Sequence, residues 1–251
     1  MVDLATVVVV AGSFLFAGTV KGVIGLGLPT VSLGLLAVSF DLTTAMALLI
    51  VPSFVTNLWQ AVVGGQHREI TRRMWPFLLG AGATVWIGAI ALRRLDLVLL
   101  SGLLGLILMV YSVISLAGYR LTISSDRENW AGLFFGTANG VLTGMTGSFV
   151  PGIMFLQALR LPRDTLVQAM GMLFTVSTVA LAMALHSNNL LTIQLGLIST
   201  GAVLPAILGM IVGQRLRQGI AEARFQQIFF VGIFLLGGYI MVKAMFATQW
   251  Q

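Results

Sequence analysis

The sequence predicts an all-α integral membrane protein built from two homologous repeats. Three observations lead to this fold class: 58% of the 251 residues are hydrophobic, only 9% are charged, and one glycine-rich pattern occurs twice. A soluble domain carries roughly 25% charged residues, so lipid must solvate much of this chain's surface. The apolar runs are continuous and do not alternate with polar residues, which favours helices over an outer-membrane barrel.

The duplicated pattern is a glycine-rich interruption that ends in a proline. The first copy, residues 18–29, reads GTVKGVIGLGLP, and the second, residues 136–151, reads GTANGVLTGMTGSFVP. Aligned on their GT and GV pairs, the two copies place Lys21 opposite Asn139. Corresponding Gly/Pro interruptions in two halves of a membrane protein are typical of transporters whose broken helices form the binding site.

Six apolar segments are long enough to cross a bilayer, which takes roughly 20 residues. They are expected at 42–64, 75–92, 97–118, 164–186, 190–212 and 225–247. The segments beside the breaks are less regular, because 30–40, 130–142 and 151–160 are only half-length. Each repeat is therefore expected to hold one Gly/Pro-broken element and three full spans. The first repeat covers 1–121 and the second 122–251, within one membrane domain.

The basic residues predict how the broken element meets the membrane. The chain has 14 Lys and Arg residues, and all except Lys21 lie at segment ends or in loops. If the broken element crosses once, these 13 residues divide six against seven between the two sides. If the element is re-entrant, ten of these basic residues lie on one side of the membrane and three (Arg93, Arg94 and Lys243) on the other. This bias marks the side with ten basic residues as cytoplasmic.

The charge distribution therefore favours a re-entrant element with no net crossing. Each repeat then has an odd number of crossings, so the second repeat is inverted relative to the first. Both termini fall on the non-cytoplasmic side of the cell inner membrane. The two breaks would enter from opposite faces and meet near the midplane.

The chemistry of the breaks predicts a site for an anion. Glycines let backbone N–H groups approach a ligand closely, and Pro29 and Pro151 suit the first turn of a helix. A short helix beginning there would aim its positive end into the membrane, which attracts anions. Lys21 is costly to bury unless it is paired or functional. All eight acidic residues lie at segment ends or in loops, so an anionic substrate would supply the counter-charge.

The residues expected to bind substrate lie in the two breaks, with one more after the interior Pro52. They are Lys21, Gly22, Gly25, Gly27, Pro29, Thr30, Asn57, Asn139, Gly140, Thr143, Gly144, Thr146, Gly147, Ser148 and Pro151. Parts of this set are open to a different interpretation. The Gly-x-x-x-Gly pairs at 18–22 and 136–140 also fit close helix packing, and Lys21 could extend to the membrane interface.

Several other classes of protein are disfavoured. There is no Cys, and two isolated His residues, His67 and His186, do not make a metal site, so neither a disulfide framework nor a bound metal is expected. The apolar segments hold no nucleophile with a base, which argues against an enzyme. We attribute the net charge of +6 to membrane orientation and expect no nucleic-acid partner. No cofactor is expected, and a homo-oligomer stays open.

The whole chain resembles the TauE/SafE family of membrane permeases. The resemblance rests on GTVKGVIGLGLPTVSLGLL, its weaker echo GTANGVLTGMTGSFVPGIMFLQAL and the basic RRL turns. Many members of the family carry a further glycine where this chain has Leu28. The resemblance implies a secondary transporter that exports a small sulfur-containing anion, such as sulfite or an organosulfonate. An anion channel for the same substrates is the alternative, and a membrane-embedded enzyme or a structural subunit is less well supported.

Overall fold

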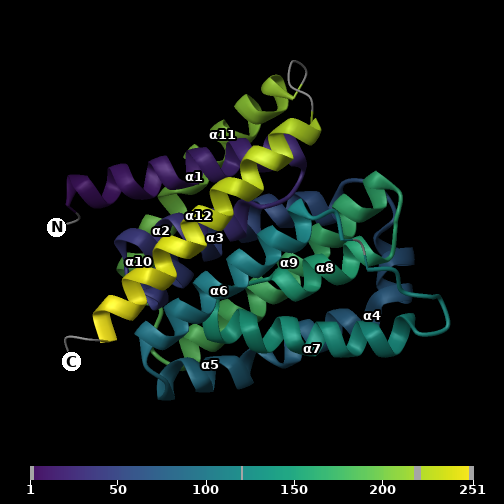
Figure 1. Cartoon of the computed structure of the whole chain (residues 1–251), viewed down its shortest axis with the longest axis horizontal. Helices are drawn as coiled ribbons and strands as arrows, with labels where there is room; N and C mark the ends of the chain where they lie inside the picture. The colour runs from purple at the N-terminus through teal and green to yellow at the C-terminus, as the bar shows by residue number, and fades with distance from the viewer. Residues whose placement is uncertain (1–2, 120, 218–221, 249–251) are drawn as a thin grey trace. The chain divides into compact units, whose positions relative to one another are not determined.

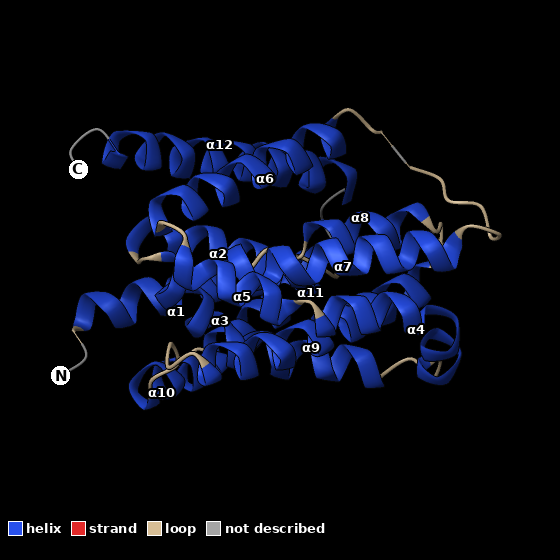
Figure 2. Cartoon of the chain, turned by 90° about the horizontal axis from the view of Figure 1, so that it is seen from below, coloured by secondary structure: helices blue, strands red, loops and turns tan. Residues whose placement is uncertain are grey.

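A computed structural model describes residues 3–119, 121–217 and 222–248, and within these ranges it contains helices and loops but no strand (Figure 2). Arg120, one of the ten basic residues in the charge comparison, lies outside the described residues. The helices are α1 (Leu4–Ile24), α2 (Leu28–Ser39), α3 (Leu42–Val62), α4 (His67–Ala83), α5 (Val85–Arg94), α6 (Leu97–Leu116), α7 (Glu128–Thr146), α8 (Val150–Ala158), α9 (Arg163–Ser187), α10 (Ile193–Gly201), α11 (Val203–Leu216) and α12 (Glu222–Thr248).

Seven helical segments among the described residues are long and apolar enough to cross a membrane. Six of them coincide with the six predicted spans. Two of these six are bent: α4 and α5 together form the segment His67–Arg94, and α10 and α11 form Ile193–Leu216. The seventh is α1, which has 21 residues and precedes the first break. The prediction of a multi-pass, all-α membrane protein is confirmed.

The lengths of the segments beside the breaks are partly as predicted. Helices α2 and α8 are short, with 12 and 9 residues. The expectation of a half-length segment at 130–142 is wrong, because α7 is a continuous helix of 19 residues. Its polar residues interrupt the apolar run without ending the helix, since their side chains find partners inside it. Thr146, for example, donates its hydroxyl hydrogen to the carbonyl oxygen of Leu142 at 2.9 Å.

The chain divides into two compact units, and each unit draws helices from both halves of the sequence. The first unit comprises Met1–Pro52, Leu95–Tyr119 and Leu191–Gln251, and the second comprises Ser53–Arg94 and Arg120–Leu190. In the first unit, α1 packs along α11 and α6 packs along α12 (Figure 1). In the second, α7 packs along α4 and α5, and α8 contacts α7 and α9.

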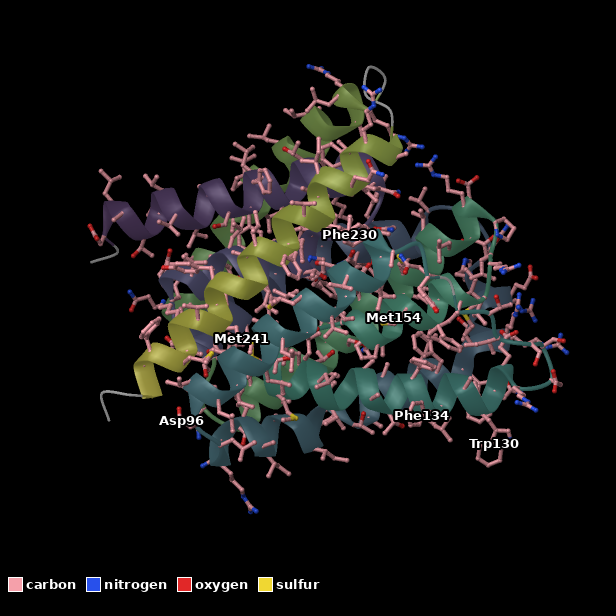
Figure 3. All side chains as sticks on the ribbon, in the orientation of Figure 1. Asp96, Trp130, Phe134, Met154, Phe230 and Met241 are labelled. Carbon is pink, nitrogen blue, oxygen red and sulfur yellow. The ribbon has the colours of Figure 1, made fainter. Side chains whose placement is uncertain are left out.

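Helices α6 and α12 of the first unit pack through a glycine and a pair of rings. A Cβ atom added to Gly105 would lie 2.9 Å from the backbone nitrogen of Met241, so the two backbones approach closely. The rings of Tyr111 and Phe230 meet edge to face, with centroids 5.3 Å apart. Figure 3 labels Met241 and Phe230 on α12, where the helix lies beside α6.

Glycines also bring α1 into backbone contact with α11. A Cβ atom on Gly18 would collide with the carbonyl oxygen of Ala206, and one on Gly22 with that of Met210. A Cβ atom on Gly209 of α11 would likewise collide with the carbonyl oxygen of Leu15. These contacts leave no room for a side chain at the three glycines. Close helix packing, the alternative left open for the Gly-x-x-x-Gly pair at 18–22, is therefore what this pair does.

The second unit repeats this arrangement with α7 and the bent pair α4–α5. A Cβ atom on Gly140 would lie 2.8 Å from the carbonyl oxygen of Ala81, and one on Gly144 would collide with that of Val85. On the far side of α7, Trp130 and Phe134 are exposed and project outward (Figure 3). Helix α7 thus has a glycine face that packs on protein and an apolar face suited to lipid.

Candidate functional site

The first break separates α1 from α2 by three residues. Gly25 ends α1 with φ of 88°, and its N–H donates to the carbonyl oxygen of Lys21 at 2.7 Å. Gly27 precedes α2 with φ of 105°, and Pro29 lies in the first turn of α2. Positive φ angles are costly for residues with a side chain, so the two glycines make this abrupt turn between helices possible.

The second break has the same construction. Gly147 ends α7 with φ of 74°, and its N–H donates to the carbonyl oxygen of Thr143 at 2.8 Å. Ser148 and Phe149 follow, and Pro151 lies in the first turn of α8. Both linkers contain three residues and begin with a left-handed glycine. The prediction that each proline opens a short helix is confirmed at both breaks.

The two breaks match each other without a gap. Gly25 corresponds to Gly147 and Pro29 to Pro151, a difference of 122 positions in both cases. Continued backwards, this register pairs Lys21 with Thr143. The sequence-based pairing of Lys21 with Asn139 is therefore wrong by four residues, one turn of helix. The glycines of α7 recur every four residues, so a shift of one turn still aligns glycine with glycine.

Contacts between helices support the corrected register. A Cβ atom on Gly22 would meet the carbonyl oxygen of Met210 and lie 2.9 Å from the nitrogen of Gln214, four residues later. A Cβ atom on the paired residue, Gly144, would collide with the carbonyl oxygen of Val85 and lie 2.7 Å from the nitrogen of Ala89, again four residues later. The two units therefore use the same packing geometry at equivalent positions.

The first break holds a buried cation and a buried hydroxyl. Lys21 lies in the last turn of α1 and only 3% of it is exposed to solvent. Thr30 lies in the first turn of α2, is 4% exposed, and its hydroxyl oxygen has no hydrogen-bond partner. Ser32 lies at the beginning of the second turn of α2. Its hydroxyl donates to the carbonyl oxygen of Leu28 at 2.8 Å.

The second break holds a network centred on Asn139, which is fully buried. Its side-chain oxygen accepts a hydrogen bond from the N–H of Gly152, in the first turn of α8, at 3.1 Å. Its side-chain nitrogen donates to the hydroxyl oxygens of Thr143 at 3.4 Å and Ser177 at 3.3 Å. Asn139 therefore joins α7 to α8 and to α9.

The hydroxyls of the second break complete this network. Thr143 donates to the carbonyl oxygen of Ser148 at 3.0 Å. The N–H of Ser148 donates to the hydroxyl oxygen of Thr146 at 3.4 Å, and the hydroxyl oxygen of Ser148 accepts from the N–H of Val150 at 3.4 Å. The polar groups predicted to face a substrate here are therefore already paired with one another.

Asn57 belongs to a second polar cluster in the same unit. Its side-chain nitrogen donates to the hydroxyl oxygen of Ser53 at 3.0 Å, and the hydroxyls of Ser53 and Thr178 are 3.3 Å apart. Ser177 and Thr178, adjacent on α9, thus contact the α7–α8 break and α3 respectively. Sequence reasoning missed both residues. The signal was an adjacent pair of hydroxyl residues in the middle of a predicted span.

Ser199 is another polar residue that sequence reasoning missed. In the first unit, its hydroxyl donates to the carbonyl oxygen of Leu48 at 2.7 Å and accepts from the N–H of Val51 at 3.1 Å. Leu48 lies four residues before Pro52, which has no N–H to offer that carbonyl. Ser199 on α10 therefore satisfies the backbone of α3 at its proline.

Pro29 and Pro151 lie at the starts of α2 and α8, and Asn57 bonds to Ser53. The other twelve predicted site residues divide into three groups by position. Gly25, Gly27 and Thr30 lie at the first break. Lys21 lies in the last turn of α1, just before it. Asn139, Thr143, Thr146, Gly147 and Ser148 form the network at the second break. Gly22, Gly140 and Gly144 lie inside helices, where their packing accounts for them. A role for any of these residues in binding substrate stays a prediction.

These features define a multi-pass helical membrane protein with two Gly/Pro-broken elements of common design. A model of the family described as "Sulfite exporter TauE/SafE" matches residues 10–240. The chain therefore belongs to the TauE/SafE family, and with it to the membrane transporters and not the enzymes, as the sequence predicted. Comparison with curated proteins gives no match, and neither does comparison with solved structures.

Proposed function

We propose that the protein is a secondary permease that moves a small sulfur-containing anion, sulfite or an organosulfonate, out of the cell across the inner membrane. The match to the family described as "Sulfite exporter TauE/SafE" over residues 10–240 supports this substrate class and this direction. The first break supports an anion because it combines the buried Lys21 with the start of α2. An α-helix leaves its first N–H groups without partners in the helix, and they attract negative charge.

In this proposal each part of the first break has a stated role. Lys21 provides positive charge, since a buried cation in a membrane protein is otherwise expensive. Gly25 and Gly27 let the backbone turn so that the N–H groups of α2 are available. Thr30 provides a hydroxyl donor for an anion oxygen.

We propose the inverted, re-entrant arrangement for the transport cycle. The common register of the two breaks and the ten-against-three distribution of basic residues support it. Alternating access then proceeds by rocking or gating of repeated elements. Labelling of single cysteines from each side of the membrane tests this topology. Labels at Arg93 and Arg215 that react from the same side would refute it.

Sulfite flux into proteoliposomes tests the function. We expect saturable uptake and counterflow by the parent protein. Lys21→Gln, which removes the charge and keeps a polar side chain, should lower flux at least about tenfold, as the loss of a charge-assisted hydrogen bond predicts. Lys21→Arg is the matched control that keeps the charge and should retain part of the flux.

The results separate a carrier from a channel and test the role of Lys21. Flux of the Lys21→Gln variant equal to the parent would remove Lys21 from the mechanism. Conductance far above carrier rates, without counterflow, would favour the anion channel. Absence of flux for sulfite and for organosulfonates alike would refute the proposed function.

A further inference from the structure

We infer that the two breaks have different functions. The first turn of α2 binds the charged group of the anion, whereas the N–H groups in the first turn of α8 are occupied by the protein's own side chains, chiefly that of Asn139. This inference rests on the proposed function and divides the predicted site between its two halves. It assigns recognition of charge to Thr30 and Lys21.

The closure of α8 is visible in its hydrogen bonds. The side-chain oxygen of Asn139 takes the N–H of Gly152 at 3.1 Å, and the hydroxyl oxygen of Ser148 takes that of Val150 at 3.4 Å. Pro151, between them, has no N–H. Since these are the groups with which the end of a helix holds an anion, the carboxamide of Asn139 stands where an anion oxygen would bind.

The start of α2 lacks such a closure. In the gapless register, Ala17 occupies the position of Asn139 and Thr30 that of Gly152. Ala17 is buried and its side chain has no polar atom to offer, and Gly27, just before α2, has no side chain. Helix α2, which the structure describes in full, has no side-chain hydrogen bond at its N-terminal cap. The Thr30 hydroxyl, 4% exposed, is also without a partner.

The pair Ala17 and Thr30 of the first break and the pair Asn139 and Gly152 of the second break place the larger side chain on opposite helices. A Cβ atom on Gly152 would lie 2.7 Å from the side-chain oxygen of Asn139 and 2.6 Å from a methyl carbon of Leu173. Residue 152 must therefore be glycine, because a side chain there would collide with that of Asn139. The first break reverses the arrangement, with the small residue on α1 and the hydroxyl residue on α2. Thr30 thereby adds a donor where the second break has only backbone.

This arrangement selects a class of ligand. A hydroxyl, the N–H groups of a first turn and a lysine are all donors, so they suit a group that presents two or more acceptor oxygens and a negative charge. A sulfite or sulfonate head group meets this requirement. The second break presents no comparable set of donors, because its network uses them internally.

Exchanging the residue pair tests the inference. The double variant Ala17→Asn, Thr30→Gly gives the first break the pair found at the second. We expect it to fold, since the same pair is accommodated in α7 and α8. Its affinity for sulfite, measured by titration calorimetry, should fall at least about tenfold, as expected for the loss of one or two hydrogen bonds to a charged group. Ser177→Ala, which removes a partner of Asn139, is the control and should change affinity less than about threefold.

Hydrogen exchange on the parent protein provides a second measurement that requires no variant. Sulfite should slow exchange in peptides that cover 28–33 and leave those that cover 150–155 unchanged. Protection of 150–155 alone, or parental affinity in the double variant, would overturn the inference while the proposed function stands. If the parent binds neither sulfite nor an organosulfonate, both the proposed function and the inference fail.

Discussion

The bond between Ser199 and the backbone of α3 offers a sharp test of the structure. Pro52 provides no N–H to the carbonyl oxygen of Leu48, and Ser199 supplies the missing donor at 2.7 Å. The same hydroxyl accepts from the N–H of Val51 at 3.1 Å. Ser199 is fully buried. The variant Ser199→Ala therefore leaves one carbonyl and one N–H group without this partner.

The magnitude follows from the number of groups that lose this partner. A buried group that loses its partner costs roughly 1–3 kcal/mol, while side-chain hydrogen bonds in membrane proteins average only about 0.6 kcal/mol and reach about 1.7. For two affected groups we expect Ser199→Ala to lower the free energy of unfolding by about 1.5–2 kcal/mol. In a Pro52→Ala background residue 52 regains its N–H, so the same substitution should cost less than about 0.7 kcal/mol.

The assay is reversible unfolding in mixed micelles for the four members of this double-mutant cycle. Ser101→Ala is the control, because the hydroxyl of the half-buried Ser101 donates to the carbonyl oxygen of Leu97 in its own helix, at 2.7 Å. This substitution should cost less than about 0.5 kcal/mol. An equal cost of Ser199→Ala in both backgrounds would show that Ser199 does not replace the donor that proline removes. That result would refute the reasoning.

Two further predictions concern helix packing and an ion pair. Gly22→Ala should destabilise the protein by about 1–3 kcal/mol through collision with α11. Gly12→Ala, whose new Cβ atom meets nothing within 4 Å, is the control and should be neutral or slightly stabilising. Equal thermal stabilities of the two variants would contradict the packing. Glu128→Gln removes the two-pronged pair with Arg73, whose bonds measure 2.7 and 2.8 Å. Because the Arg73 side chain is 46% exposed, we expect a loss of about 1 kcal/mol that shrinks in high salt, and an unfolding midpoint equal to the parent at low salt would contradict it.

Much of the fold could be predicted from composition and periodicity. The six spans, the positions of both breaks and the prolines that open α2 and α8 all follow from local signals, since an apolar run or a Gly/Pro pair acts within a few residues. The length of α7 could not be predicted in this way. Its polar residues look like an interruption until the hydrogen bonds that satisfy them are known.

The site was harder to predict because its contacts link distant segments. The pairing of Lys21 was displaced by four residues because glycines spaced by one helical turn align equally well in two registers, and only the helix contacts choose between them. Ser177, Thr178 and Ser199 act through partners far away in sequence. Ser199, for example, meets Leu48, 151 residues earlier. No local pattern reveals such pairs.

The mixed composition of the two units sets an order for biogenesis. Every helix of the second unit, Ser53–Arg94 and Arg120–Leu190, is synthesised before α10. The glycine face of α1, by contrast, waits for α11, since Ala206 follows Gly18 by 188 residues (206 − 18). During this interval Lys21 is in the nascent chain without the helix against which α1 packs. Until α11 is made, the insertion machinery or lipid must cover the glycine face of α1. A chain truncated before α11 would leave α1 without its packing partner.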